Sequence, residues 1–392
     1  MEIFTLLWVN SGEEFIMAVN KRFDALDSFR GLCAISVVIY HVNMAGSLTE
    51  LSFFRGSHLL VDFFFVLSGF VLAHGYGFKS GLRFKDFFIS RTFRIFPLHV
   101  FMLGVFILLE VGKWLAYKKG FMFNSVPFTG VTAPHEILPN LVLVQSWTTL
   151  TNPLSYNFPA WSISVEYYMY MIFFALTMLR GAGKYLAWAA LSLSALYLLL
   201  TNHHGLTEEV LRGLSCFFGG SLTYALYRRV ADNINLSYTL ASLVEIVVLV
   251  AAITVVALPV PEKTLTCILL FCLCVFTFSL EQGAVSQLMK RPFFLRMGVL
   301  SYSIYMTHAA ILFCLISLMI VMQKVTGWHI APMVGDKRYL DFGSALMNNV
   351  ALLAILALVI FVAGITNRRI EKHWQQIGRS LTQSYALRRA EK

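Results

Sequence analysis

The sequence predicts an all-α fold, a polytopic membrane helix bundle of about ten transmembrane helices with the N-terminus and the C-terminus in the cytoplasm. Of the 392 residues, 58% are hydrophobic and 13% are charged, whereas a soluble domain carries about twice that charged fraction. Apolar runs of about 18 residues or more recur from residue 31 to residue 365, and a helix of that length crosses a hydrocarbon core of about 30 Å. Lysine and arginine are concentrated in alternate connecting segments, which indicates that the chain crosses the membrane repeatedly.

The expected spans leave no long hydrophilic domain between them. We therefore expect a cytoplasmic extension at 1–21, one transmembrane domain at 22–372 and a basic cytoplasmic tail at 373–392. The boundaries of each span are defined to within about two to four residues. The ten spans are expected at 31–48, 58–77, 95–117, 161–180, 184–201, 210–227, 238–258, 264–281, 297–322 and 344–366.

The first twenty residues do not resemble a cleavable signal peptide, because they lack a basic lead and carry Glu13 and Glu14. Translation starts at either Met1 or Met17. If residues 1–30 face the cytoplasm, 22 of the 31 lysine and arginine residues fall on that side and nine on the other, so both termini are expected inside.

The net charge of +10 indicates first of all which segments face the cytoplasm. The inner basic loops also favour contact with anionic membrane lipids. Nucleic acid is not expected as a partner. The six cysteines all fall inside expected spans, where they behave as small hydrophobic residues. No disulfide framework and no metal site is predicted.

The first span carries Arg30 and His41 within the stretch DSFRGLCAISVVIYH. On a helix, a separation of eleven residues amounts to three turns plus about 20°, so the two side chains share one face about 16 Å apart. Arg30 then lies at the cytoplasmic edge and His41 near the middle of the bilayer. This arrangement suits a long ligand with an anionic head and a reactive end. The alternatives are an arginine that extends to the interface and a histidine that binds a neighbouring helix.

The second span, HLLVDFFFVLSGFVLAHGYG, places Asp62 about one turn below the outer surface. A carboxylate within hydrocarbon costs about 2.5–3.5 kcal/mol on insertion scales, so Asp62 needs a partner. We expect it to accept a hydrogen bond from His41 and fix the tautomer of the imidazole. Ser68 and Gly69, half a span later, are typical of close helix packing.

The third span opens with KDFFISRTFRIFPLH, which places Arg91 and Arg94 on one helix face at the inner edge. In isolation these residues indicate no more than the cytoplasmic excess of positive charge. Two guanidinium groups on one face also bind phosphate well. Because Arg30 lies on the same side, an anionic phosphorylated ligand is the better interpretation.

The fourth and ninth spans add two more ionisable residues at a similar depth. PAWSISVEYYMY carries Glu166 a turn and a half below Trp161, and GVLSYSIYMTH carries His308 about 13–15 Å from its inner end, level with His41. Four ionisable groups from four helices, His41, Asp62, Glu166 and His308, are therefore expected to meet near one depth. They are the candidate catalytic residues.

Five motifs in order resemble the membrane-bound acyltransferase-3 family: RFDALDSFRGLCAISVVIYH, VDFFFVLSGFVL, ISRTFRIFPLH, PAWSISVEYYMY and LSYSIYMTH. The resemblance runs from about residue 22 to about residue 310, and it implies a stand-alone member without an appended soluble domain. It implies that Arg30 and His41 serve activity and that Arg91 and Arg94 bind the donor. The family often has two successive acidic residues where this chain has Glu166 and Tyr167, so no role is assigned to a second carboxylate.

The resemblance further implies transfer of an acyl group, commonly acetyl, from cytoplasmic acyl-coenzyme A to a hydroxyl of an extracytoplasmic or lipid-linked glycan. The expected location is the cytoplasmic membrane of a bacterium. In this mechanism His41 acts as general base, with Asp62 or Glu166 orienting its imidazole, or it carries the acyl group itself in two steps. Two alternatives from the residues alone are a proton-coupled transporter of an anionic solute and a lipid-binding or sensor protein. The acceptor, the acyl chain length and the oligomeric state are not predicted.

Overall fold

A computed structural model describes residues 22–121, 125–201, 205–260, 262–335 and 337–390. The expected extension at 1–21, with its two candidate start residues, lies outside the described residues. The described chain is a bundle of long helices with one two-stranded antiparallel hairpin, β1 (Met333–Val334) and β2 (Lys337–Arg338). The predicted all-α fold is confirmed.

Within the described residues, each of the ten expected spans overlaps one long helix. Long apolar stretches favour continuous helix in a membrane, because a helix bonds the polar groups of the backbone within the segment. Pro97 lies inside α4 without ending it. These helices are α1 (Asp24–His41), α3 (Leu60–Gly75), α4 (Phe84–Lys118), α6 (Ala160–Thr177), α7 (Gly183–Leu200), α8 (Glu208–Val230), α9 (Tyr238–Ala257), α10 (Lys263–Leu280), α12 (Pro292–Thr326) and α13 (Ala345–Thr366).

Shorter elements connect the long helices. Among them, η1 begins where the Ser47 side chain accepts a backbone N–H. They are η1 (Leu48–Glu50), α2 (Ser52–Gly56), η2 (Ser57–Leu59), η3 (Gly130–Thr132), η4 (Pro134–Glu136), α5 (Ile137–Leu141), η5 (Ala231–Asn233) and α11 (Ala284–Met289).

Seven helical segments of the described chain are long and apolar enough to cross a membrane, which supports an integral membrane protein. They comprise α2 to α3, α4, α7, α9, α10, α12, and α13 with its continuation. The other three long helices, α1, α6 and α8, lie among them and carry more polar residues. The number of ten spans and the sides on which the termini lie stay predictions.

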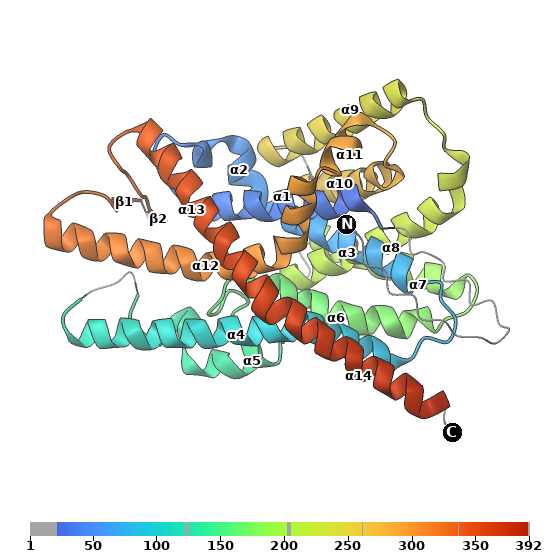
Figure 1. Ribbon diagram of the computed structural model, residues 1–392, viewed down its shortest axis with the longest axis horizontal. Helices are drawn as coiled ribbons and strands as arrows, with labels where there is room; N and C mark the ends of the chain where they lie inside the picture. The colour runs from blue at the N-terminus through green and yellow to red at the C-terminus, as the bar shows by residue number, and fades with distance from the viewer. Residues whose placement is uncertain (1–21, 122–124, 202–204, 261, 336, 391–392) are drawn as a thin grey trace, which may run out of the picture.

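The first helix ends earlier than expected. The sequence predicted a span at 31–48, but α1 ends at His41, and Val42 is extended with φ −93°. The chain then turns at Gly46, whose φ of +61° suits glycine. His41 therefore lies at the end of its helix and not deep inside it. Figure 1 shows α4 and α12 extending past this end of α1. The side chain of His41 is half-buried and contacts Phe158 and His308.

Pairs of glycines allow the helices that carry the site to cross at backbone contact. A Cβ added to Gly31 of α1 would lie 2.4 Å from the backbone of Met297, and one added to Gly298 of α12 would lie 2.3 Å from the carbonyl oxygen of Asp27. Gly69 of α3 faces the backbone of α8 in the same way, at 1.8 Å. The prediction that Gly69 serves helix packing is confirmed.

The end of the described chain is a helix that packs on the bundle. The sequence predicted a basic tail at 373–392, whereas helix α13 continues through a π-helical turn, η6 (Asn367–Glu371), into α14 (Lys372–Ala390). Helix α14 lies against α4 (Figure 1). This turn matters because π-helical turns inside helices often mark functional positions.

Candidate functional site

The imidazole rings of His41 and His308 lie side by side. Their centroids are 5.2 Å apart, and the ring of Phe158 contacts both, at 4.5 Å from His41 and 5.7 Å from His308. Helix α1 supplies the first ring at its last residue and α12 supplies the second, because the glycine crossing described above holds these two helices together. The two histidines were expected at the same depth in the bundle, and in the structure their rings are in direct contact.

Backbone carbonyl groups fix the tautomer of both rings. His41 Nδ1 lies 2.8 Å from the carbonyl oxygen of Val37, and His308 Nδ1 lies 2.7 Å from that of Tyr305. A carbonyl only accepts, so each Nδ1 carries the proton and each Nε2 keeps its lone pair. Nε2 of His308 is buried and has no hydrogen-bond partner among the described residues. Two basic nitrogen atoms thus lie in one apolar pocket.

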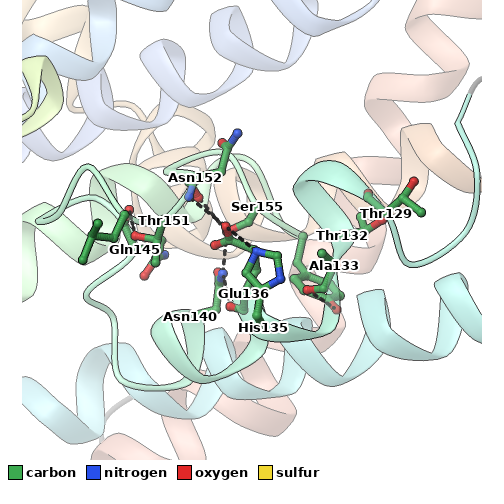
Figure 2. Close-up of polar contacts among 12 residues, drawn as sticks. Thr129, Thr132, Ala133, His135, Glu136, Asn140, Gln145, Thr151, Asn152 and Ser155 are labelled. Atoms are coloured by element: carbon green, nitrogen blue, oxygen red, sulfur yellow. Dashed lines mark hydrogen bonds and ion pairs between the residues drawn. The ribbon is translucent and has the colours of Figure 1, made fainter.

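Phe158 reaches the histidines from the segment that connects α4 to α6. A buried polar network holds this segment (Figure 2). The backbone N–H of Asn152 donates to Glu136 Oε1 at 3.0 Å, and Asn140 Nδ2 donates to Ser155 Oγ at 2.6 Å. One residue before Phe158, the amide of Asn157 donates to the carbonyl of Met306 on α12 at 3.2 Å. These contacts determine where the Phe158 ring lies.

The backbone of this segment is strained close to the histidines. Tyr156 has φ +55°, in the left-handed region that non-glycine residues seldom adopt, and hydrogen bonds to the carbonyls of Val131 and Ala133 hold it there. Burial, followed by the Glu110 and Glu136 carboxylates, raises the pKa of Tyr156 above its ordinary value of 10. The phenol is therefore a neutral donor at physiological pH.

Asp62 has a different partner from the one expected. Its carboxylate accepts from Arg212 Nε at 3.2 Å and from Nη2 at 3.1 Å, and the side chain of Asp62 is 1% exposed. The carbonyl of Val37, not Asp62, binds Nδ1 of His41. The structure corrects the expected contact because a carboxylate buried beside a guanidinium forms a bidentate pair with it. The guanidinium also lies over the ring of Trp161, at 5.7 Å from its centroid.

A cavity with about 90 Å³ of water-accessible volume lies beside Tyr305. It brings together two of the expected donor-binding residues, Arg30 and Arg94, with Glu166 and with Glu371 from the π-helical turn. Arg30 is held by Ser301, to whose hydroxyl its Nε donates at 2.9 Å. Arg94 makes no hydrogen bond or ion pair with any described residue. Other lining residues come from α3, α6 and α12 and include Ser68, Ser162, Tyr170, Tyr302 and Tyr305.

Glu166 is bound by hydroxyl groups inside this cavity. Ser68 donates to its Oε1, and Tyr170 donates to the same atom at 2.5 Å. Helix α6 places Glu166 and Tyr170 one turn apart on one face. Glu166 contributes to the cavity wall and not to the orientation of His41, since Val37 holds that ring.

Tyr305 joins the cavity to the histidine pair. It lines the cavity, its ring centroid lies 6.0 Å from that of His308, and its hydroxyl is 2.9 Å from Ser162 Oγ. Tyr305 therefore lies between the imidazole of His308 and the cavity that Arg94 lines. Hydroxyl groups at this junction can donate to an oxyanion.

Arg91 lies outside this cavity, one turn before Arg94. One of its Nη atoms donates to the Tyr76 hydroxyl at 2.9 Å. Burial alone would raise the pKa of Tyr76, but the positive charge of Arg91, with hydrogen bonds from Ser90 and Arg91 and the charge of Arg94, lowers it below its ordinary value of 10. An excess of positive charge at this end of α4 explains that direction.

Sequence reasoning missed three contributors to the site: Phe158, Tyr305 and Glu371. Phe158 stands just before a predicted span and Tyr305 is one of many aromatic residues, so neither carries an electrostatic signal. Glu371 could have been found as an acidic residue in an otherwise basic segment. The described residues contain no group of three or more histidine, cysteine, aspartate or glutamate side chains suited to a metal ion.

Comparison with known proteins points to one family. The model of a family described as "Acyltransferase domain" matches residues 23–368. "Protein 2 in picA locus" of Rhizobium radiobacter is 41% identical over 88 residues, which are 22% of this chain and 44% of that protein. No solved structure matches the chain.

Two relatives have names that state an activity. "Putative peptidoglycan O-acetyltransferase YrhL" of Bacillus subtilis is 26% identical over 197 residues, 46% of this chain and 27% of that protein. "Peptidoglycan O-acetyltransferase OatA" of Listeria monocytogenes is 27% identical over 158 residues, 39% of this chain and 24% of that protein. The chain spans less than half the length of each of these three relatives.

Proposed function

Because this chain belongs to the acyltransferase-3 family, whose domain model it matches over residues 23–368, we propose that it is an integral membrane O-acyltransferase. It moves an acyl group, most simply acetyl, from acyl-coenzyme A to a hydroxyl of a glycan or a lipid-linked glycan. Relatives named as peptidoglycan O-acetyltransferases support a glycan acceptor. The cytoplasmic membrane of a bacterium is the proposed location.

One observation carries the proposal: Tyr305, whose ring contacts that of His308, lines a cavity that also contains the guanidinium groups of Arg30 and Arg94. The donor's phosphates bind Arg91 and Arg94, and Arg30, which is paired with Asp27 at 3.3 Å, lines the same cavity as Arg94. The pantetheine arm extends along the cavity toward Tyr305. The uncharged arm suits a lining that mixes hydroxyl and aromatic side chains.

The chemical step uses the lone pair of His41. The acceptor hydroxyl gives its proton to Nε2 while its oxygen bonds to the thioester carbonyl carbon, and the C–S bond then breaks. The departing thiolate takes the proton from the imidazolium, which restores the starting base. Val37 keeps the ring oriented throughout, because Nδ1 donates to its carbonyl in both states. Hydroxyl groups of Tyr305 and Ser162 stabilise the oxyanion.

His308 and Phe158 complete the pocket. The ring of Phe158 restricts the rotation of both imidazoles and shields them from water. Nε2 of His308 offers a second acceptor for the attacking hydroxyl or for the Nε2 proton of His41. The acceptor enters from the side of the 125–159 segment, which carries Phe158.

Incubation of membranes that contain the protein with labelled acetyl-coenzyme A tests the proposal. Label is expected in extracted glycans or glycolipids, and none in membranes without the protein. Transport of an anionic solute in reconstituted vesicles, without chemical change and without any labelled product, would contradict the proposal and favour a transporter.

A further inference from the structure

A second cavity lies between α4 and α14, on the far side of Arg94 from the histidine pair. It has about 100 Å³ of water-accessible volume, and three of the side chains that line it are arginine while none is acidic. Arg94 lines both cavities. The polar lining comes from Ser90, Arg91 and Arg94 on α4 and from Gln375, Arg379 and Thr382 on α14.

Carboxylates balance the positive charge of this cavity only in part, since Arg94 also lines the first cavity with Glu166 and Glu371. None of its three guanidinium groups forms an ion pair with a described residue. Nε of Arg91 is buried and also lacks a hydrogen-bond partner among the described residues. Buried polar groups are nearly always satisfied, and the Arg91 Nε is one that is not, whereas the Arg379 side chain is exposed and free to meet a ligand. The arrangement therefore indicates a ligand with several anionic oxygens.

Helix α14 presents its polar side chains to α4 from one face. Gln375, Arg379 and Thr382 are spaced by four and three residues, which places them in one row. Between them Gly378 is buried against Phe93, where an added Cβ would lie 2.7 Å from the Phe93 Cβ. Further along, the amine of Lys85 lies 3.5 Å from the centre of the Tyr385 ring. Arg379 thus has a defined position opposite Arg91 and Arg94.

We propose that this cavity binds the terminal phosphomonoester of the acyl-coenzyme A donor, with Arg379 as its principal ligand. The inference rests on the proposed function, in which the pantetheine arm occupies the cavity beside the histidines. Arg94 stands where the cavities meet, so it contacts the diphosphate at the centre of the donor. The ribose phosphate then extends away from the histidines toward Arg379. Arg379 lies beyond residue 368, where the family match ends, so the family assigns it no role.

A ligand-by-mutation cycle tests the inference. Calorimetry measures binding of acetyl-coenzyme A, and of the same donor without its 3′-phosphate, to the purified full chain in detergent. The wild type should bind the complete donor about tenfold more tightly than the dephosphorylated one. Arg379→Gln should lose about tenfold for the complete donor and almost nothing for the dephosphorylated one. Arg379→Lys should fall between them, because a lysine keeps the charge but not the bidentate geometry.

Arg369→Gln is the matched control, since Arg369 is an exposed arginine in the same helical run that lines neither cavity. Its affinities should equal those of the wild type. Wild-type affinity of Arg379→Gln for acetyl-coenzyme A, or an equal loss for both donors, would overturn the inference and leave the proposed function standing. A wild type that binds neither donor would overturn both.

Discussion

Removing the Arg212 guanidinium tests whether Asp62 stabilises the fold or takes part in the reaction. Asp62 is 1% exposed and both its oxygens accept from Arg212, so Arg212→Gln leaves a buried carboxylate without its cation. Breaking a buried pair in this way costs about 3–5 kcal/mol. The side chain of Arg212 is 16% exposed, so water reaches the pair from one side and we expect the lower end, about 3 kcal/mol.

The assay is thermal unfolding of the purified protein, with activity measured on the folded fraction. At about 2 °C per kcal/mol, Arg212→Gln should lower the melting midpoint by roughly 6 °C. Asp62→Asn should cost less, about 1–2 kcal/mol, because the remaining guanidinium still contacts the Trp161 ring and water. The double variant should cost about 2 kcal/mol less than the sum of the two single variants.

Arg229→Gln, at an exposed arginine of the same helix, is the control and should change stability by less than about 0.5 kcal/mol. Folded Asp62→Asn protein should transfer the acyl group at close to the wild-type rate, because Val37 and not Asp62 holds His41. An unchanged melting midpoint together with a hundredfold loss of transfer in Asp62→Asn would refute this reasoning and assign Asp62 to the reaction.

Three further variants test other parts of the account. Gly298→Ala places a Cβ 2.3 Å from the Asp27 carbonyl oxygen, so α1 and α12 must separate. Thermal melts should show a loss of several kcal/mol in the free energy of unfolding, and wild-type stability would exclude close packing there. Arg94→Gln should raise the KM for acetyl-coenzyme A about tenfold, with kcat within about threefold of wild type, in initial-rate assays. Arg83→Gln, at an exposed arginine, is the control, and a loss confined to kcat in Arg94→Gln would contradict a role in donor binding. Asn140→Ala removes buried hydrogen bonds to Ser155 and to the backbone, so the free energy of unfolding should fall by about 2 kcal/mol in the same melts. The rate of acyl transfer should fall as well, and an unchanged rate would show that this network does not position the site.

The sequence predicted the fold because apolar runs and helix periodicity can be recognised along the chain without knowledge of the contacts between helices. Apolar runs determine where helices form in a membrane, and α9, α10 and α13 lie within one or two residues of their predicted ends. The common face of Arg30 and His41 follows from helix geometry alone, and α1 contains both residues. The end of α1 was misplaced because Val42 to Leu48 is largely apolar, although it contains Asn43 and Ser47 and turns at Gly46.

Contacts between helices could not be predicted in the same way. The pair of Asp62 and Arg212 joins residues 150 positions apart, and Arg212 had been counted among the basic residues of the outer side. The only available signal was that each of the two charged residues lies within about one turn of a span's end. Helix α14 was missed because its polar face has no membrane signature, although the spacing of Gln375, Arg379 and Thr382 is helical.

The rate of acyl transfer by the His41→Ala variant tests the central claim most directly. Purified wild type, His41→Ala and the exposed-site control His329→Ala are compared with labelled acetyl-coenzyme A and the acceptor fraction that the membrane experiment identifies. Loss of a general base predicts a fall of about 10²–10⁴-fold for His41→Ala, with donor affinity unchanged and His329→Ala equal to wild type. Transfer by His41→Ala within a few fold of wild type would contradict the assignment of the histidine pair as the reacting site.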